Sequence, residues 1–584
     1  MMRFNNITII ISILLILSSS TFAEDEQIFN NWSYPHYQDN LLIWEMKGKT
    51  AMVRDDKIIL SGLELTYYLQ PISPTAPAEI TKKGKVLISA DTGTLKKQQQ
   101  TVSLHDNIVV RKISETPDEF DETLTTDMLL INLADKTFSN DALITINRND
   151  ISIKSKGCKG GLDFANISFL ENVETIIQGC NSKSICLGAV FSPKPNIDDE
   201  ALNKTPSVIT ITSEGPMTIE KINGNPANPP ERPNGRAGKI SQQISFRNKV
   251  ALNSYSRPPN SPPRQTNLRA ENLNILLDRR ENPVTKRNNF YLARASATNN
   301  VRIDDSFHSA ACSGLTADET AGLITLKGDE KSLAAITRPL KPNNGQSQTK
   351  ANSYINIAAQ TLKIQTEKDN ILLLGRKELT FSNGSIYNPD PISPTDSLRS
   401  PQADLVSPTD TAPPMNSPPG ISTQIQITAD NDGLISLREN QIYLENNVRI
   451  SQKAKTITDP AGSELRATIK CDKLSIGWNP AKNLLEKMRA ENNVAVNTND
   501  GQAWCEILEW VPLLSQIYLK SPRKVKILHK NSNIDGDKII ITTNPQTAGY
   551  MGDWNKIEIE NKTNGSIRIG PKEKEEPKEG EKPK

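Results

Sequence analysis

The heptapeptide LENNVRI, residues 444–450, contains the pattern that decides the fold. Its three apolar residues alternate with Glu445 and Arg449. Successive side chains of a β-strand point to opposite sides, so the apolar residues share one face and the two charges share the other. The heptapeptide therefore predicts a half-buried strand, dry on one side and solvated on the other.

Copies of this heptapeptide recur along the chain and place an apolar residue, a polar residue and Val or Ile at alternate positions. They are LHDNIVV at 104–110, FRNKVAL at 246–252, ATNNVRI at 297–303, AENNVAV at 490–496, the weaker FLENV at 169–173 and the degenerate ILLLGRKELTF at 371–381. The solvated face should carry His105, Arg111, Arg247, Arg302, Glu445, Arg449 and Glu491. The recurrent Asn predicts a strand start or a β-bulge, because Asn tolerates turn geometry that β-branched residues resist.

A second pattern has a small residue, then Leu or Ile three positions later, often with another apolar residue two beyond. It occurs as TDMLLI at 126–131, AENLNI at 270–275, CSGL at 312–315, AQTLKI at 359–364, CDKLSI at 471–476, CEILEW at 505–510 and GDKIII at 536–541. We expect each copy to begin a β-strand.

The spacing of the copies is irregular. Val494 follows Val448 by 46 residues, whereas Val448 follows Val301 by 147 residues. A parallel β-helix needs coils of nearly constant length, so this irregularity argues against one. An antiparallel meander or jelly roll places insertions in hairpin loops, and the pattern predicts an all-β protein of that kind.

Composition favours several modest cores joined by linkers. The chain is 36% hydrophobic and contains 37 prolines, and its 69 basic residues nearly balance 67 acidic residues. This balance gives no long-range field to attract nucleic acid. Proline-rich linkers are expected at 71–77, 192–207, 224–235, 257–264, 338–351 and 388–420, and a disordered charged tail from 571.

The first 23 residues predict export. Arg3 is followed by an apolar run from Ile9 to Leu17 and by Thr21-Phe22-Ala23, the small-x-small pattern of a cleaved signal peptide. The alternative is a retained anchor, although the run is about half of the ~20 residues that a spanning helix needs. We therefore expect a periplasmic protein that begins near Glu24.

The residues that usually carry catalysis or bind metals are scattered. His36, His105, His308 and His529 lie far apart in sequence and outside metal-ligand spacing. Cys312, Cys471 and Cys505 occupy the small position of the second pattern and are predicted to be buried spacers. Two of Cys158, Cys180 and Cys186 could form a disulfide in an oxidising compartment, and the sequence does not decide which. We predict no catalytic, metal or cofactor-binding residue and no enzymatic activity.

The paired patterns resemble the OstA-like repeat of the lipopolysaccharide-transport proteins LptA and LptC. The stretch 57–177, with KIILSGLELTYYL and LISADTGTLKKQQQTVSLHDNIVVRK, is most similar to LptC, whereas 267–326 and 423–562 are more similar to LptA. The resemblance covers roughly half of the chain, and no long transmembrane barrel follows the repeats.

The resemblance implies several antiparallel β-jelly-roll segments that hold lipid A acyl chains in an apolar groove and associate with other transport proteins by β-strand addition. The implied groove residues are Leu104, Ile108, Val110, Phe246, Val250, Leu252, Val301, Ile303, Leu444, Val448, Ile450, Val494 and Val496. An ordinary closed core is the alternative for each of them.

The expected organisation has seven parts. They are a signal peptide at 1–23, an LptC-like β-domain at 40–190, a linker-rich segment at 191–264, an OstA-like domain at 265–387, a proline-rich linker at 388–422, an LptA-like domain at 423–565 and a charged tail at 566–584. A structural envelope scaffold and a glycan-binding or enzymatic β-solenoid remain alternatives to lipopolysaccharide transport.

Overall fold

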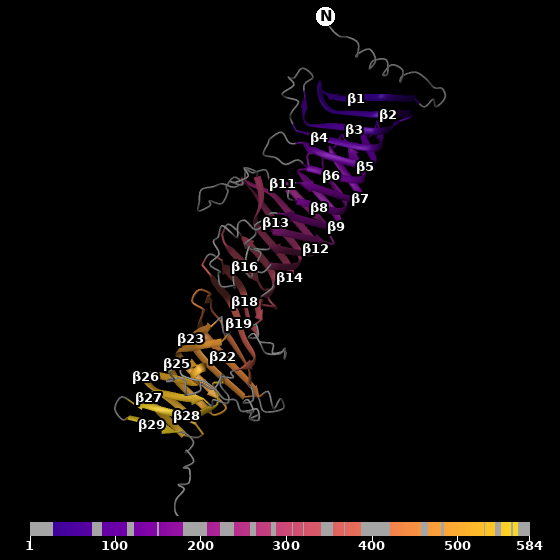
Figure 1. Cartoon of the computed structure of the whole chain (residues 1–584). Helices are drawn as coiled ribbons and strands as arrows, with labels where there is room; N and C mark the ends of the chain where they lie inside the picture. The colour runs from indigo at the N-terminus through magenta and orange to yellow at the C-terminus, as the bar shows by residue number, and fades with distance from the viewer. Residues whose placement is uncertain are drawn as a thin grey trace, which may run out of the picture. The chain divides into compact units, whose positions relative to one another are not determined.

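The computed structural model describes eighteen stretches of the chain (Figure 1). They are residues 27–72, 84–113, 122–148, 151–178, 207–221, 239–256, 264–281, 288–305, 308–318, 321–339, 354–366, 368–386, 421–456, 465–479, 484–530, 532–543, 550–561 and 565–569. The predicted signal peptide, Cys180, Cys186, the charged tail and nearly all of each predicted linker lie outside these residues.

The described residues divide into two compact units. The first comprises residues 1–180, 208–250 and 274–291, and the second comprises 181–207, 251–273 and 292–584. The boundary passes through the strands β12 (Lys239–Ser256), β13 (Arg264–Glu281) and β14 (Asn288–Asp305).

The first unit is a meander in which each of β1 to β9 pairs antiparallel with the next strand. β10 and β11 then pair with opposite ends of β9, so that two short strands take the place of one bent strand. The strands are β1 Gln27–Gln38, β2 Leu41–Arg54, β3 Lys57–Ile72, β4 Lys85–Lys96, β5 Thr101–Ile113, β6 Glu122–Asn132, β7 Thr137–Arg148, β8 Ile151–Gly161, β9 Asn166–Gln178, β10 Ser207–Ser213 and β11 Met217–Lys221.

The second unit repeats this arrangement. β16 and β17 share the partners β15 and β18, β20 and β21 share β19 and β22, and β22 to β29 form an uninterrupted antiparallel meander. The elements are β15 Ser309–Asp318, β16 Leu323–Lys327, β17 Ala334–Pro339, β18 Tyr354–Gln365, β19 Asn370–Ile386, β20 Ile421–Ala429, β21 Gly433–Ser436, β22 Gln441–Thr456, β23 Leu465–Asn479, β24 Leu484–Thr498, β25 Gly501–Val511, η2 Pro512–Leu514, β26 Gln516–His529, β27 Ser532–Thr543, β28 Trp554–Asn561 and β29 Gly565–Ile569.

These pairings confirm the predicted all-β, jelly-roll-like fold. Every described strand pair within the two units is antiparallel, which contradicts the parallel β-solenoid alternative. The part of the chain that the structure describes contains no helix with the length and hydrophobicity of a membrane span.

Each repeated heptapeptide forms a crease in the middle of a strand. Both central residues adopt the left-handed conformation, with φ of 62° and 49° at Asn446 and Asn447 and 62° and 53° at Asn492 and Asn493. The strand register shifts at these positions, between Glu445 and Val448 for example. The predicted bulge is therefore confirmed, and Asn fits because its short polar side chain tolerates this backbone.

The prediction that the second pattern begins strands is wrong. Thr126 lies inside β6, Cys471 inside β23 and Cys505 inside β25, each beside the crease of the neighbouring strand. The small residue of the pattern lies in mid-strand, where it pairs with the residue that follows the crease of the neighbouring strand.

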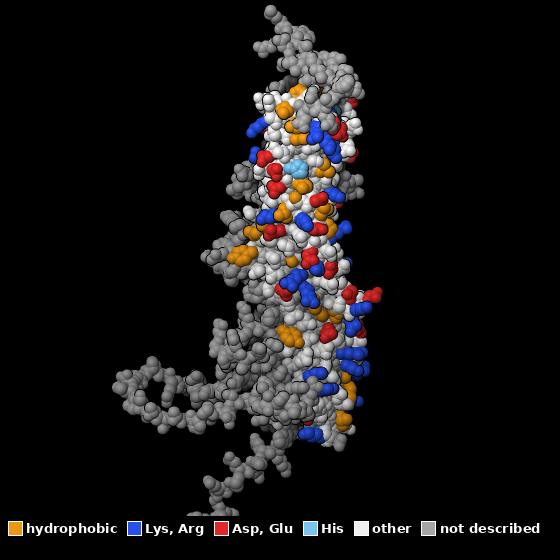
Figure 2. Space-filling model, turned by 90° about the vertical axis from the view of Figure 1, so that its right-hand side faces the viewer, with side chains coloured by type: hydrophobic (Ala, Val, Ile, Leu, Met, Phe, Trp, Pro, Cys, Tyr) orange, Lys and Arg blue, Asp and Glu red, His pale blue; other side chains and the backbone are white. Residues whose placement is uncertain are grey.

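Burial alternates along the strands as predicted. Arg111, Arg247, Arg302 and Arg449 are exposed and Glu491 is half-buried, whereas their apolar neighbours are buried. On the face that Figure 2 shows, acidic and basic side chains are interspersed with scattered hydrophobic ones. The strands are therefore one-sided, and their apolar faces form the interior of each unit.

Candidate functional site

The interior of the second unit is built from apolar rows that cross the strands on both sides of the crease. Registry places each member directly beside the next, so one row runs through Ile427, Ile450, Ile469, Val496, Ala503, Ile527 and Ile534. The other runs through Ile435, Ile442, Ile476, Met488, Trp510, Ile517, Ile541 and Ile557. No member is more than 5% exposed.

The first unit contains an equivalent row across β2 to β8. Its members are Met46, Leu65, Ile88, Val110, Leu124, Ile146 and Ile153. The row continues into Thr175, whose hydroxyl donates to the Met217 sulfur at 3.3 Å. Cross-strand apolar pairs are the unit of sheet stabilisation, and repeating them in register produces a dry surface perpendicular to the strands.

All thirteen predicted groove residues lie in these interiors. Their exposed fractions are at most 4%, the largest being that of Val496. Leu104, Ile108, Val110, Phe246 and Val250 belong to the first unit, and Leu252, Val301, Ile303, Leu444, Val448, Ile450, Val494 and Val496 belong to the second. Their contact with lipid stays a prediction.

A carboxylate and an amide link neighbouring strands at the crease. The Asn493 side-chain amide donates to the Asp472 carboxylate at 2.6 Å, and Asn107 donates to Asp91 at 2.7 Å. Asn447 and Asp430 repeat the contact at 2.5 Å. We call this contact the crease clamp. In each case the Asp directly follows a small buried residue, Cys471, Ala90 or Ala429, and no local sequence pattern predicts the contact.

The cysteines at the crease confirm their predicted role as buried spacers. Cys312, Cys471 and Cys505 are buried free thiols. Burial raises the pKa of Cys471 and Cys505 to about 12 and that of Cys312 to about 11. A thiol held neutral in this way is a poor nucleophile and a poor metal ligand at physiological pH.

Cys158 is also a buried free thiol, and burial raises its pKa to about 12. It therefore takes no part in the disulfide considered from the sequence. Pairing of Cys180 with Cys186 falls outside the described residues.

Gln452 and Lys377 are two of the buried polar residues that lie in the inward rows of the second unit. Gln452, 0% exposed, accepts a hydrogen bond at 3.0 Å from the backbone amide of Met551, 99 residues away. Tyr550 and Met551 are fully buried beside this contact, so these two residues fill part of the interior. The other polar group is Lys377 in β19, which is 1% exposed.

The first unit contains a buried charge cluster at the ends of its strands. Glu122 forms ion pairs with Lys112 at 3.9 Å and with Arg148. Lys112 is 7% exposed and Glu122 is 2% exposed. Because each buried charge has an opposite partner, the cluster is compatible with a folded core.

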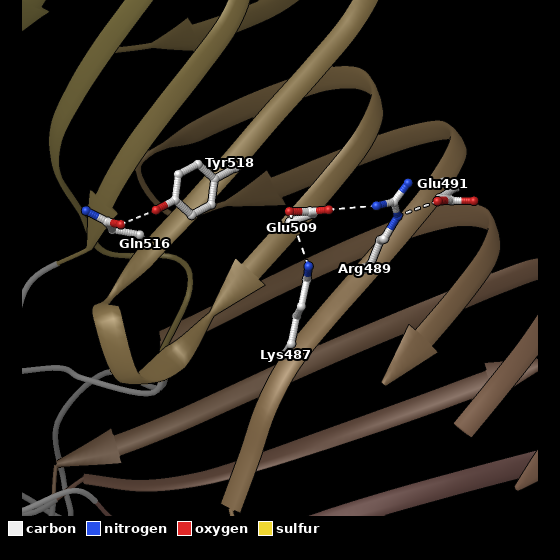
Figure 3. Close-up of polar contacts among 6 residues, drawn as sticks. All are labelled: Lys487, Arg489, Glu491, Glu509, Gln516 and Tyr518. Carbon is white, nitrogen blue, oxygen red and sulfur yellow. Dashed lines mark hydrogen bonds and ion pairs between the residues drawn. The ribbon is translucent and has the colours of Figure 1, made fainter. Parts of the chain in front are cut away.

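The outer face of β24 to β26 carries a polar network, shown in Figure 3. Glu509 accepts from Arg489 at 2.8 Å and pairs with Lys487 at 3.4 Å, while Arg489 also contacts Glu491. Tyr518 donates to Gln516. These side chains point away from the apolar rows. Ion pairs between side chains on the outer face of a sheet stabilise the pairing of the strands by about 0.2–1 kcal/mol each.

The histidines pack locally. His36 stacks on Trp44 with ring centroids 4.7 Å apart, His529 lies 6.0 Å from Trp554, and the His308 backbone amide donates to Asp305 at 2.7 Å. The described ranges contain no group of three or more His, Cys, Asp or Glu residues able to hold a metal ion.

Residues 74–178 match the model of the family described as lipopolysaccharide-assembly, LptC-related. The match covers β4 to β9 and overlaps the segment whose sequence resembles LptC, which confirms that resemblance. This family belongs to lipopolysaccharide transport and is associated with the cell envelope. A comparison with curated proteins finds no match.

Proposed function

We propose that this chain is a periplasmic lipopolysaccharide-binding protein that holds lipid A acyl chains in its apolar interior and bridges part of their route to the outer membrane. The LptC-related segment supports the choice of cargo. The single observation that carries the proposal is the set of buried apolar rows that cross successive strands in register in each unit. The signal-peptide pattern of residues 1–23 supports export.

The chemistry of an acyl chain explains why such rows suit it. A saturated chain makes no hydrogen bonds, so its site must present apolar side chains and keep backbone polar groups paired. On either side of the creases, backbone amides and carbonyls pair with those of the neighbouring strand, while alternate side chains supply the dry surface. Along these rows an acyl chain would meet apolar side chains from one strand to the next.

The interior is packed in this structure, which sets a condition on loading. Val448 and Leu252 are 0% exposed. An acyl chain can therefore enter only if the two parts of the bent sheet, which meet at the crease, move apart. The left-handed Asn pairs are the natural hinge, because the strands bend there and the register is interrupted. The same close packing favours the second candidate function, a structural scaffold whose rows serve only as a core.

The edge strand β1 offers a surface for the proposed association with other transport proteins. Within the described residues it pairs with β2 alone. Its sequence QIFNNWSYPHYQ contains no Lys, Arg, Asp or Glu, and Ile28, Tyr34 and Tyr37 are 47–60% exposed. Edge strands are commonly protected by charges, so an uncharged edge with exposed aromatics is suited to strand addition.

Site-specific photo-crosslinking in living cells tests the proposal. A photoreactive amino acid at Val448 or Val250 should yield lipopolysaccharide adducts. Its matched controls at Arg449 and Arg247, which point outward from the same strands, should yield none. Protein adducts without lipid at every inward position, in variants that retain normal levels, would favour the scaffold.

Depletion provides an independent measurement. If the chain transports lipopolysaccharide, its depletion should lower the amount of lipopolysaccharide on the cell surface. Lipopolysaccharide should then accumulate at the stage before the step that needs this protein. Unchanged surface lipopolysaccharide would again favour the scaffold.

A further inference from the structure

Lys377 occupies a position that is apolar in the other repeats. In β19 the inward residues are Leu373, Lys377 and Leu379, with Gly375 and Arg376 at the crease. The corresponding inward series in β22 runs Leu444, Val448, Ile450. One repeat therefore carries a lysine where the others have Val or Ile.

The lysine is buried rather than solvated at its tip. Its side chain is 1% exposed, and its Nζ has no hydrogen-bond partner among the described residues. The cross-strand neighbours on both sides are Ala359 and Ala429, whose short side chains leave room along the lysine stem. An ammonium group in such a place costs several kcal/mol when nothing pairs with it.

Two carboxylates lie near the lysine and are engaged elsewhere. Asp430 accepts from the amide of Asn447 at 2.5 Å, and Asp432 accepts from the backbone N–H of Gly375 at 3.3 Å. Neither forms an ion pair with Lys377 in the described structure. Burial lowers the pKa of Lys377 from its usual value of 10.5, and the two carboxylates only partly oppose this effect.

We infer that Lys377 is an anchor for the acidic group of an amphiphile whose acyl chain lies against the flanking apolar rows. The occupant must bring an oxyanion to the amine and a hydrocarbon chain to Leu373 and Leu379. An acid-bearing lipid has both features, whereas a free inorganic anion has only the first. The inference rests on the proposed function, because it assumes that acyl chains enter the interior.

Equilibrium binding to the purified full chain tests this inference, with palmitate and its uncharged methyl ester as probes. A hydrogen bond to a charged group predicts that the wild type binds palmitate about tenfold more tightly than the ester. Lys377→Met should bind both probes alike. Arg376→Gln, which changes the adjacent exposed cation, should keep the wild-type preference, and Lys377→Leu provides a second variant should Lys377→Met fold poorly.

The outcomes separate this inference from the proposed function. A preference for palmitate that survives in Lys377→Met, or equal binding of both probes by the wild type, would overturn the anchor and leave acyl-chain binding intact. Binding of neither probe by the wild type would overturn both. Inorganic phosphate should not displace palmitate at equal concentration, and displacement would show a site for free anions instead.

Discussion

The Asn residues at the crease have two roles: their side chains hydrogen-bond to a neighbouring Asp, and their backbones adopt the left-handed conformation. Substitutions of Asn493 separate these roles. The side chain of Asn493 donates to Asp472 at 2.6 Å, and its backbone has φ of 53°. Asn493→Gly removes the hydrogen bond but keeps the backbone permissive, and should cost about 0.5–1 kcal/mol because the contact is exposed. Asn493→Ala should cost about 1 kcal/mol more, since a Cβ without a polar group is disfavoured there. Asn493→Val should cost the most.

Amide hydrogen exchange of peptides from β23 and β24 measures these losses where they occur. Asn497→Ala is the matched control, because Asn497 is an exposed residue of the same strand without a left-handed backbone. It should change the opening free energy by less than about 0.5 kcal/mol. Equal costs for Gly, Ala and Val at position 493 would refute the claim that backbone conformation selects Asn at the crease.

Three further predictions concern buried groups of the second unit. Because burial raises the pKa of Cys471 and Cys505 to about 12 from 9.0, their contribution to stability is complete below pH 9 and is lost as pH rises towards 12. Replacing both with Ala should flatten this decline in denaturant titrations, and an unchanged slope would contradict the assignment. Gln452→Leu leaves the Met551 amide without its acceptor and should cost about 1–3 kcal/mol, with faster exchange at that amide; unaltered exchange would contradict the contact. The pKa of Lys377 is lower in the folded chain than its usual value of 10.5, so the unfolded chain binds this proton more tightly than the folded chain does. The free energy of unfolding of the wild type should therefore rise with pH up to about 10.5. Lys377→Leu should therefore be more stable than the wild type by a margin that shrinks over this range, and a margin independent of pH would count against a buried amine.

The apolar rows were predictable from the sequence because period-two alternation is a local signal. All thirteen residues chosen from it are buried. The crease was only half predictable. Asn446 indicated a bulge, but the sequence does not show that Cys471 lies beside the bend of the neighbouring strand, since that depends on registry between strands. For this reason the small-residue pattern wrongly predicts a strand start.

Other features depend on contacts that no local pattern reports. The hydrogen bond between Gln452 and Met551 joins residues that are 99 positions apart. Lys377 could have been found, because aligning ILLLGRKELTF with LENNVRI places it opposite Val448. The lysine is the departure from the apolar row in this degenerate copy, and that departure is visible in the sequence.

Tryptophan fluorescence provides the most direct test of acyl-chain binding in the interior. Trp510 and Trp504 lie in β25, the first 1% exposed within an inward row between Met488 and Ile517, the second 45% exposed on the outer face. Two variants of the full chain would each retain one of these tryptophans and carry Phe at the other five positions. Bromine quenches indole fluorescence on contact, so acyl-chain binding in the interior predicts that dibromostearate quenches Trp510 and spares Trp504. Quenching of Trp504 alone, or of neither, would contradict it.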